Sequence, residues 1–246
     1  MDEFKIEGRN AVTELLKSDK TVNKLMIQKG ERQGSINEII KLAKNKKIII
    51  TEVDKYKLDQ LSETKHHQGV IAFVSPIEYK ELDDIFELAK ERNEAPFILI
   101  ADEIEDPHNL GALIRSAECA GCHGVIIPKR RAVAVTEVVA KTSVGATEYV
   151  PIVRVNNINE TIRELKDRGV WIVGTDGSAK VTYYDQDMTG SIAIIIGSEG
   201  RGMNKLTMEN CDFLVKIPMM GKITSLNASV SGGIVLFEAL KQRLKK

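Results

Sequence analysis

The sequence predicts an α/β protein built from two domains. Its 246 residues exceed the most common length of a single domain. Segments with helical and strand-like patterns alternate along the chain, which is typical of α/β folds. In the C-terminal part the strand-like segments are near-continuous apolar runs, such as FILI and IAIII. Such runs fit a parallel sheet that helices cover on both faces.

Residues 1–75 are expected to form a small α/β domain. The expected order is a helix at 8–18, a strand at 21–28, a helix at 36–45, a strand at 47–53, a short helix at 56–63 and a strand at 69–75. Ser35 and Glu38 have the spacing of a capping box at the start of the second helix. The dipeptide Ser75-Pro76 is a plausible end of this domain.

Residues 76–95 are expected to form a linker with a charged amphipathic helix at 79–95. From residue 96 to 246 the alternation restarts and predicts one larger domain. Strands are expected at 97–103, 124–128, 149–155, 170–176, 191–199 and 213–219, and helices at 109–121, 135–144, 157–169, 204–211 and from about 225 to 243.

Composition narrows the class of protein. The counts of 35 basic and 35 acidic residues give no net charge, so the global field predicts no polyanionic partner. No apolar run approaches the roughly 20 residues of a membrane helix, and the charged N-terminus has no signal-peptide core. Three cysteines suggest a reducing compartment. These observations predict a soluble cytoplasmic protein without a membrane association.

One stretch has the spacing of a covalent haem site, Cys119-Ala-Gly-Cys122-His123. The stretch also completes an amphipathic helix that Gly121 and Gly124 end, so a structural role is favoured over haem or redox chemistry. No cysteine or carboxylate near His66 and His67 in the sequence completes a metal site, and no metal is expected.

Three segments follow predicted strands, where ligands bind in open parallel sheets. In the first, Asn109 stands where a helix N-cap is expected and Arg115 follows within two turns. In the second, three glycines of the segment 197–202 follow a buried strand and let a backbone approach a ligand. In the third, the last helix begins with small residues between 225 and 233, which permit close backbone packing. Each segment alone also fits an ordinary turn, cap or helix contact.

Taken together and in this order, the three segments resemble the SpoU or TrmH-like RNA ribose 2′-O-methyltransferases. The resemblance covers roughly residues 96–245, and no departure is seen at the positions the family uses. Residues 1–75, with GRNAV near the start, resemble the ribosomal-protein-like RNA-binding domain of the RlmB-type branch, which acts on large-subunit ribosomal RNA.

The resemblance implies a deep trefoil knot in the C-terminal parallel-sheet domain, in which S-adenosyl-L-methionine binds. It assigns cofactor contacts to Gly197, Ile217 and Leu226, mostly through the main chain. It implies that Arg115 activates a ribose 2′-hydroxyl for methyl transfer. A guanidinium stays protonated, so we expect Arg115 to stabilise charge rather than act as a base. Supporting catalytic roles are expected for Asn109, Glu199, Ser225 and Asn227.

RNA contacts are expected from Arg9 in the first domain and from Lys129, Arg130, Arg131 and Lys141 in the second. The resemblance further implies a homodimer packed through the knotted domain. The expected substrate is a nucleotide of 23S ribosomal RNA, with guanosine as its base. Two alternatives stay open: a transfer RNA ribose methyltransferase, and a non-catalytic RNA-binding or ribosome-assembly factor with the same fold.

Overall fold

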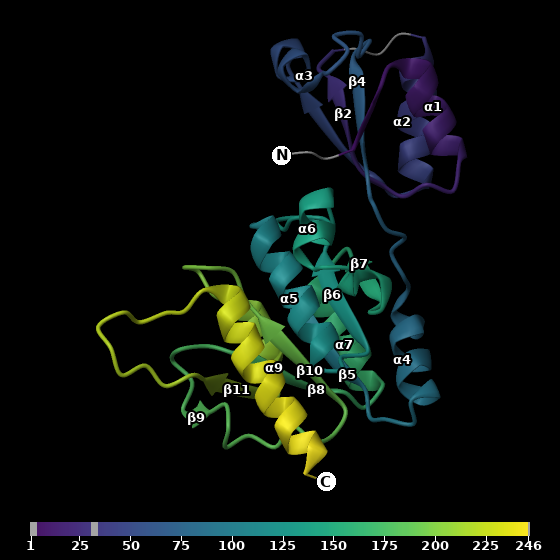
Figure 1. Ribbon diagram of the computed structural model, residues 1–246. Helices are drawn as coiled ribbons and strands as arrows, with labels where there is room; N and C mark the ends of the chain where they lie inside the picture. The colour runs from purple at the N-terminus through teal and green to yellow at the C-terminus, as the bar shows by residue number, and fades with distance from the viewer. Residues whose placement is uncertain (1–3, 31–33, 246) are drawn as a thin grey trace. The chain divides into compact units, whose positions relative to one another are not determined.

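The computed structural model describes residues 4–30 and 34–245. The chain divides into two compact units (Figure 1). The first consists of Met1–Glu78 together with Ala134–Val138, and the second of Tyr79–Val133 together with Val139–Lys246.

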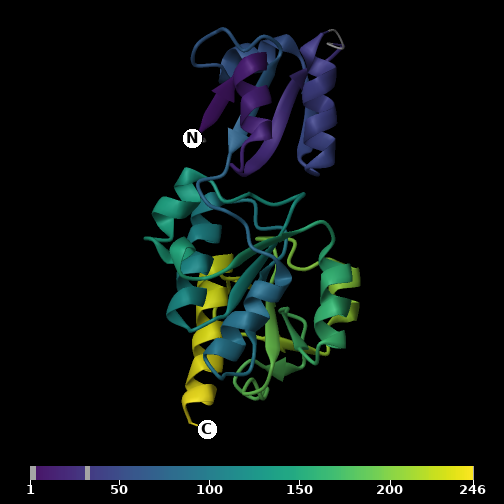
Figure 2. The same ribbon diagram turned by 90° about the vertical axis from the view of Figure 1, so that its right-hand side faces the viewer.

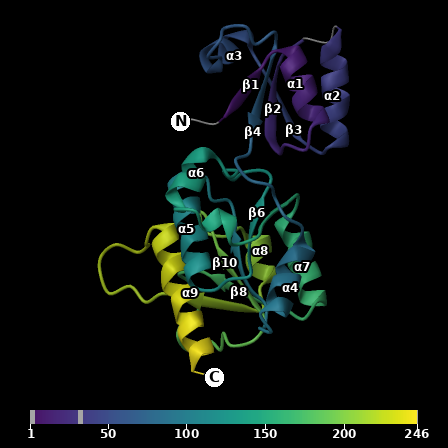
Figure 3. The ribbon, with the colours of Figure 1, turned by 45° about the vertical axis from the view of Figure 1, so that its right-hand side comes forward.

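The first unit is an α/β sandwich around a four-stranded mixed sheet. The strand order is β1-β4-β2-β3, with β2 and β3 parallel and β4 antiparallel to both β1 and β2. Figure 3 shows α1 and α2 side by side and α3 apart from them. Val12 of α1 and Ile39 of α2 share a core with Leu25 of β2, while Leu58 of α3 packs on Phe73 across the other face. The elements are β1 (Lys5–Glu7), α1 (Arg9–Lys17), β2 (Val22–Gln28), α2 (Ser35–Asn45), β3 (Ile49–Val53), α3 (Lys55–Leu61) and β4 (Val70–Val74).

The expected capping box at Ser35 is wrong. Helix α2 already begins at Ser35, and its N-cap is Gly34 at φ 62°, which has no side chain that could cap the helix. Ser35 is the first residue of the helix and not its N-cap. The reciprocal bonds of a capping box between Ser35 and Glu38 are therefore not formed. Glycine adopts this positive φ readily because it has no Cβ to clash with the backbone.

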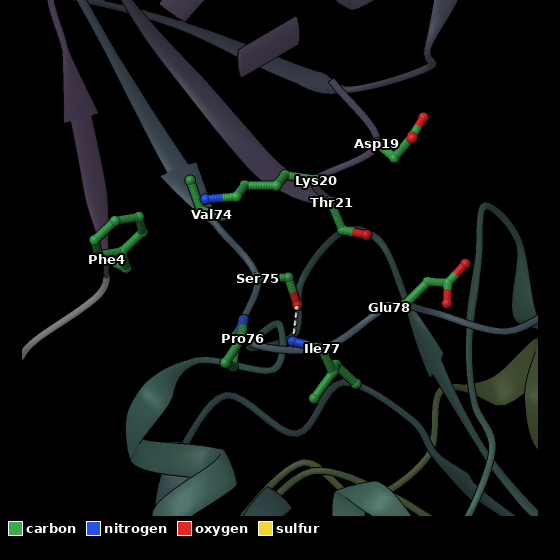
Figure 4. A pocket seen from close by; sticks show the side chains of 9 residues that line it. All are labelled: Phe4, Asp19, Lys20, Thr21, Val74, Ser75, Pro76, Ile77 and Glu78. Carbon is green, nitrogen blue, oxygen red and sulfur yellow. Dashed lines mark hydrogen bonds between the residues drawn. The ribbon is translucent and has the colours of Figure 1, made fainter. Parts of the chain in front are cut away.

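A small pocket lies at the end of β4, within the first unit (Figure 4). Its lining includes Phe4, Lys20, Val74 and Pro76. The amide of Ser75 donates to the carbonyl of Thr21 over 2.8 Å, and the Ser75 hydroxyl accepts from the amide of Ile77 over 3.3 Å. These bonds fix the backbone immediately after β4, so the chain stays ordered as it leaves the sheet.

The second unit is built on a seven-stranded sheet that is parallel throughout. Its order is β7-β6-β5-β10-β8-β11-β9, and every pair is parallel, as the continuous apolar runs predicted. Its elements are α4 (Leu82–Glu91), β5 (Phe97–Ala101), α5 (Pro107–Cys119), β6 (Gly124–Pro128), α6 (Glu137–Thr142), the 3-10 turn Ala146–Glu148, β7 (Ile152–Val155), α7 (Ile158–Asp167), β8 (Trp171–Thr175), β9 (Val181–Thr182), β10 (Ile192–Ile196), α8 (Lys205–Asn210), β11 (Phe213–Lys216) and α9 (Ala228–Leu244).

Helices cover both faces of this sheet (Figure 2). Ile85 of α4 and Ile162 of α7 pack against Ile98 and Ile195 on one face. On the other face α9 lies beside α5 and against β10. All residues of β5, β6 and β10 are buried. The α/β class with a covered parallel sheet is thus confirmed.

The start of α5 differs from the expectation. Its N-cap is Asp106 rather than Asn109, because the Asp106 carboxylate accepts from the amides of His108 and Asn109, and Pro107 occupies the first turn. Asn109 is therefore inside the helix, and its side chain is available for other partners.

The small residues at the start of α9 have a packing reason. The helix begins at Ala228, so Ser225 precedes it, and Asn227 is its N-cap. A Cβ on Gly232 would lie 2.3 Å from the Leu113 side chain of α5, whereas one on Gly233 would meet nothing closer than 3.8 Å. Gly232 is thus needed for α9 to approach α5.

Candidate active site

A pocket opens beyond the carboxyl ends of three neighbouring strands, β10, β8 and β11. Its lining includes the sequence-predicted residues Gly197, Glu199, Ile217, Ser225 and Leu226. Parallel strands end at a common edge, which brings their following loops together although they are distant in sequence. The long loop from β11 to α9, drawn in yellow-green and yellow, supplies another wall.

The loop after β10 folds back tightly on itself. The amide of Ser198 donates to the carbonyl of Gly202 over 3.2 Å, and the amide of Gly202 returns a bond to the Ser198 carbonyl over 2.9 Å. A Cβ on Gly197 would lie 2.5 Å from backbone atoms of Gly202 and Met203. Gly197 is therefore required by the closure of this loop, which leaves main chain rather than side chain at the edge of the pocket.

The carboxylate of Glu199 joins three segments of the chain. Its Oε1 accepts from Nδ2 of Asn109 over 3.0 Å, from Nδ2 of Asn227 over 2.5 Å and from the amide of Ala228 over 3.2 Å. Asn109 belongs to α5, Glu199 to the loop after β10, and Ala228 to the first turn of α9. One oxygen atom thus holds both helices at the rim of the pocket.

Asn227 serves this cluster and caps α9 at once. Its Nδ2 also donates to Oδ1 of Asn109 over 2.8 Å. Its Oδ1 accepts from the amides of Ser229 and Val230, over 2.9 Å and 3.2 Å, and from the Ser229 hydroxyl over 2.6 Å. Both the nitrogen and the oxygen of the side-chain amide form hydrogen bonds, and these bonds fix the orientation of Asn227.

Arg115 lies on the same helix as Asn109, six positions further on, and its side chain is exposed. Within residues 4–30 and 34–245 the structure gives its guanidinium no hydrogen bond or ion pair, and it does not line the pocket. Ser225 is exposed and lines the pocket without joining the Glu199 cluster. Arg115 is therefore held in place only through its helix.

The predicted RNA-binding residues of the second unit do not line the pocket. Lys129, Arg130 and Arg131 follow β6, and Arg131 pairs with Glu103 over 3.5 Å. Lys141 is exposed in the last turn of α6. Arg9 belongs to the first unit, where its Nε donates to the carbonyl of Gln68 over 3.0 Å.

Two strand-end carboxylates were missed by the sequence reasoning. Asp102 follows β5 and is buried, and burial, followed by repulsion from Glu103, raises its pKa to about 6, although a bond from Thr207 opposes the shift. Asp176 follows β8 and lines the pocket. A sequence signal for both existed, because each is the first acidic residue after an apolar strand, where ligands bind in parallel sheets.

The Cys-X-X-Cys-His stretch is part of the packing of the second unit. Cys119 is exposed, while Cys122 is buried, and both are free thiols. Burial raises the pKa of the Cys122 thiol, so it stays protonated. The buried ring of His123 accepts from the amide of Phe97 through Nδ1 over 3.0 Å and contacts Glu94 through Nε2 over 3.1 Å. These contacts tie the end of α5 to the start of β5.

Residues 4–30 and 34–245 contain neither a cluster that could bind a metal ion nor a membrane-spanning helix. In the described part of the chain, no three His, Cys, Asp or Glu side chains are grouped so that they could hold a metal ion. No helix in that part combines the length and apolar character needed to cross a bilayer.

The all-parallel sheet and the strand-end pocket define an α/β domain of the class in which ligands bind at the carboxyl edge of the sheet. Residues 96–237 match the SpoU rRNA Methylase family, and residues 5–80 match a domain described as RNA 2'-O ribose methyltransferase substrate binding.

Known relatives match either nearly the whole chain or about two thirds of it. A Bacillus subtilis protein named "Putative TrmH family tRNA/rRNA methyltransferase YacO" is 50% identical over 236 residues, covering 96% of this chain and 94% of that protein. The structure of the SpoU methyltransferase AviRb from Streptomyces viridochromogenes, in complex with the cofactor AdoMet, gives a TM-score of 0.64 at 25% identity and covers 99% of this chain and 92% of that one. A TrmH/SpoU tRNA modifying enzyme of A. aeolicus gives a TM-score of 0.57 at 29% identity, over 66% of this chain and 84% of that one.

The chain belongs to the SpoU/TrmH methyltransferase family. It is an RNA methyltransferase that uses S-adenosylmethionine, and its first unit carries the family's substrate-binding domain.

Proposed function

We propose that this protein methylates the ribose 2′-hydroxyl of a guanosine in 23S ribosomal RNA, as expected of the RlmB-type branch. The observation that carries the proposal is the hydrogen-bond cluster of Asn109, Glu199 and Asn227. It fixes the first turns of α5 at the rim of the pocket, and Arg115 extends from that same helix. The site then has a place for a methyl donor and a cation for an anionic acceptor.

The pocket suits S-adenosylmethionine in shape and charge. Gly197 lets the loop after β10 close on its own backbone and so leaves main-chain groups at the pocket edge, while Ile217 and Leu226 offer apolar contact to a purine ring. The carboxylates of Asp176 and Glu199 offset the positive charges of the cofactor. When bound, the cofactor supplies an electrophilic methyl group. Gly197, Ile217 and Leu226 would hold it, mainly through main-chain groups.

Arg115 has the central role in the proposed chemistry. Its guanidinium stays charged at any working pH, so it cannot remove the proton of the 2′-hydroxyl. It holds the phosphate next to the target ribose and stabilises the negative charge that develops on the hydroxyl oxygen. The phosphate or a water molecule takes the proton. Asn109 and Ser225 orient the hydroxyl, and Glu199 and Asn227 keep the loops in register.

The knot and the homodimer belong to the same proposal. We propose that the C-terminal segment of the chain passes through a loop of this domain, and the bond from the Ala228 amide to Glu199 joins the start of α9 to the segment after β10. A second copy would cover the apolar stripe of α9, where Val230, Phe237 and Leu244 are 49%, 47% and 77% exposed. The expected functional regions stay at 1–75, 76–95 and 96–246.

Ribosomal RNA is favoured as the substrate over transfer RNA. Residues 5–80 match a substrate-binding domain, while the A. aeolicus enzyme named for tRNA modification matches only 66% of this chain. RNA contacts are proposed for Arg9, Lys129, Arg130, Arg131 and Lys141, which implies binding that weakens steeply with salt.

The deciding experiment offers the enzyme both substrates together. Transcripts of 23S rRNA domains and bulk tRNA, at equal nucleotide concentration, are incubated with methyl-tritiated S-adenosylmethionine. We expect label in rRNA, at a nucleotide whose 3′ phosphodiester resists alkali because its 2′-oxygen is blocked. Label confined to tRNA, or label released with the free base after glycosidic cleavage, would contradict the proposal.

A further inference from the structure

Asp176 is a fixed carboxylate that lines the cofactor pocket, and the proposed function uses its charge but names no group of the cofactor that it contacts. It is the first residue after β8, and its amide donates to the carbonyl of Val215 on β11 over 2.9 Å. Its Oδ1 accepts from the amide of Ser178 over 2.8 Å and from the Ser178 hydroxyl over 2.5 Å. Backbone and side chain are therefore both held before any ligand arrives.

The second carboxylate oxygen, Oδ2, is turned toward the loop after β10. A Cβ on Gly202 would lie 3.8 Å from it. In the described part of the chain the structure gives Oδ2 no hydrogen-bond donor. The other charged groups that line the pocket are Glu199, whose Oε1 has three donors from α5 and α9, and Lys216, a cation. Oδ2 of Asp176 thus presents an open anionic acceptor on the β8 side of this pocket.

The strand order places Asp176 away from the reacting end. Asn109, near the start of α5, follows β5, Glu199 follows β10, and Asp176 follows β8, in the order β5-β10-β8. Neighbouring strands are about 4.8 Å apart, so the end of β8 lies roughly 10 Å from the end of β5. If the proposed function holds, the methyl group lies on the side of Asn109 and Glu199, and the nucleoside part then extends toward Asp176.

We propose that Oδ2 of Asp176 accepts a hydrogen bond from a ribose hydroxyl of S-adenosylmethionine. A carboxylate is an acceptor only, and the two vicinal hydroxyls of a ribose are donors that match it. Parallel-sheet folds that bind dinucleotides use a strand-end carboxylate in the same way. This inference rests on the proposed placement of the cofactor, and it adds a residue that recognises the sugar.

The test is calorimetric binding to the full chain, with no turnover involved. The ligands are S-adenosylhomocysteine, its 2′,3′-dideoxy analogue, and 5′-methylthioadenosine, which keeps the ribose hydroxyls but has no amino-acid group. The variants are Asp176→Ala and Asp176→Asn, with the exposed Asp167→Asn on α7 as the matched loss of one charge. Thermal melting checks that each variant folds.

We expect Asp176→Ala to lower the affinity for S-adenosylhomocysteine about ten- to hundredfold, as for the loss of a hydrogen bond to a charged group. Asp176→Asn should lose less affinity than Asp176→Ala, and Asp167→Asn should keep the wild-type affinity. The loss should persist with 5′-methylthioadenosine and nearly vanish with the dideoxy analogue.

Three results would overturn the inference alone: unchanged binding of S-adenosylhomocysteine by Asp176→Ala, an equal loss with the dideoxy analogue, or a loss that disappears with 5′-methylthioadenosine, which would assign Asp176 to the cofactor's ammonium group. If Asp176→Ala and Gly197→Ala both bind S-adenosylhomocysteine with wild-type affinity, the cofactor does not bind in this pocket. That result would contradict the proposed site as well as this inference.

Discussion

The side-chain amide of Asn109 donates to Oε1 of Glu199 over 3.0 Å and thereby joins the start of α5 to the loop that follows β10. The same oxygen receives Asn227 and the first amide of α9. A single carboxylate oxygen therefore sets the relative position of the segments that we assign to the methyl donor and to Arg115.

Glu199→Gln should lower methyl transfer at least tenfold. The variant keeps the shape but loses the charge that strengthens three hydrogen bonds, and bonds to charged groups contribute about 1.5–3 kcal/mol. Glu209→Gln is the control, since Glu209 is exposed and pairs with Lys205 only at 3.7 Å. Transfer of tritiated methyl to RNA measures both. Equal activity of the two variants would show that the Glu199 charge is not needed.

Asn227→Ala should lose both stability and activity, whereas Asn157→Ala should lose stability alone. Each asparagine is an N-cap, of α9 and α7 respectively, and each side chain accepts from two backbone amides. Loss of a cap costs about 1 kcal/mol. Asn227 also donates to Asn109 and Glu199, whereas Asn157 is placed at the start of α7 and does not line the pocket. Melting temperatures and methyl transfer separate the two effects, and matching activities would argue against a role for the cluster.

Gly232→Ala should destabilise the second unit, and Gly233→Ala should stabilise it. The added methyl at 232 meets the fully buried Leu113, and overpacking costs typically about 1–3 kcal/mol. At 233 the methyl has room, and an alanine within a helix is favoured over glycine by about 0.5–1 kcal/mol. Thermal unfolding of both variants is the measurement. If Gly232→Ala melts at or above the wild-type temperature, α9 does not need this close approach to α5.

Asp102→Asn should raise the stability of the second unit at pH 8 by about 1–3 kcal/mol. Burial raises the pKa of Asp102 from 3.8 to about 6, so folding disfavours the ionised form. The penalty is therefore full above pH 6, falls between pH 6 and 4, and is absent at lower pH, where the carboxyl is protonated in both states. Unfolding of wild type and variant at pH 8 and pH 5 should show a gain at pH 5 that is about half as large. A gain that is constant with pH would contradict the assignment.

The regular elements could largely be predicted from the sequence because their signals are local. Apolar runs such as Ile192–Ile196 identified the parallel strands, and their burial confirms the prediction. Helix starts were less predictable, since several residues near a start can cap it. Asp106 displaced Asn109 as the cap of α5, and Gly34 displaced Ser35 for α2.

The site was predicted only in part, because its contacts join distant segments. Asn109 and Glu199 were chosen for their motifs, but their hydrogen bond spans 90 positions and has no local signature. Gly197 was expected to admit a ligand, and its nearest constraint is the backbone of its own loop. Asp102 and Asp176 were missed because a single acidic residue after a strand is common and only burial or a pocket distinguishes it.

The central claim is that Arg115 serves the transfer step and not the binding of the cofactor. The most direct measurement compares Arg115→Ala with Arg163→Ala, an exposed arginine on α7 that is truncated in the same way. For each, calorimetry gives the affinity for S-adenosylhomocysteine, and single-turnover assays give methyl transfer to 23S rRNA transcripts. The account predicts that Arg115→Ala binds the cofactor like wild type and loses at least about a hundredfold in transfer, as when a group that stabilises developing charge is removed. Transfer by Arg115→Ala at the rate of Arg163→Ala would contradict it.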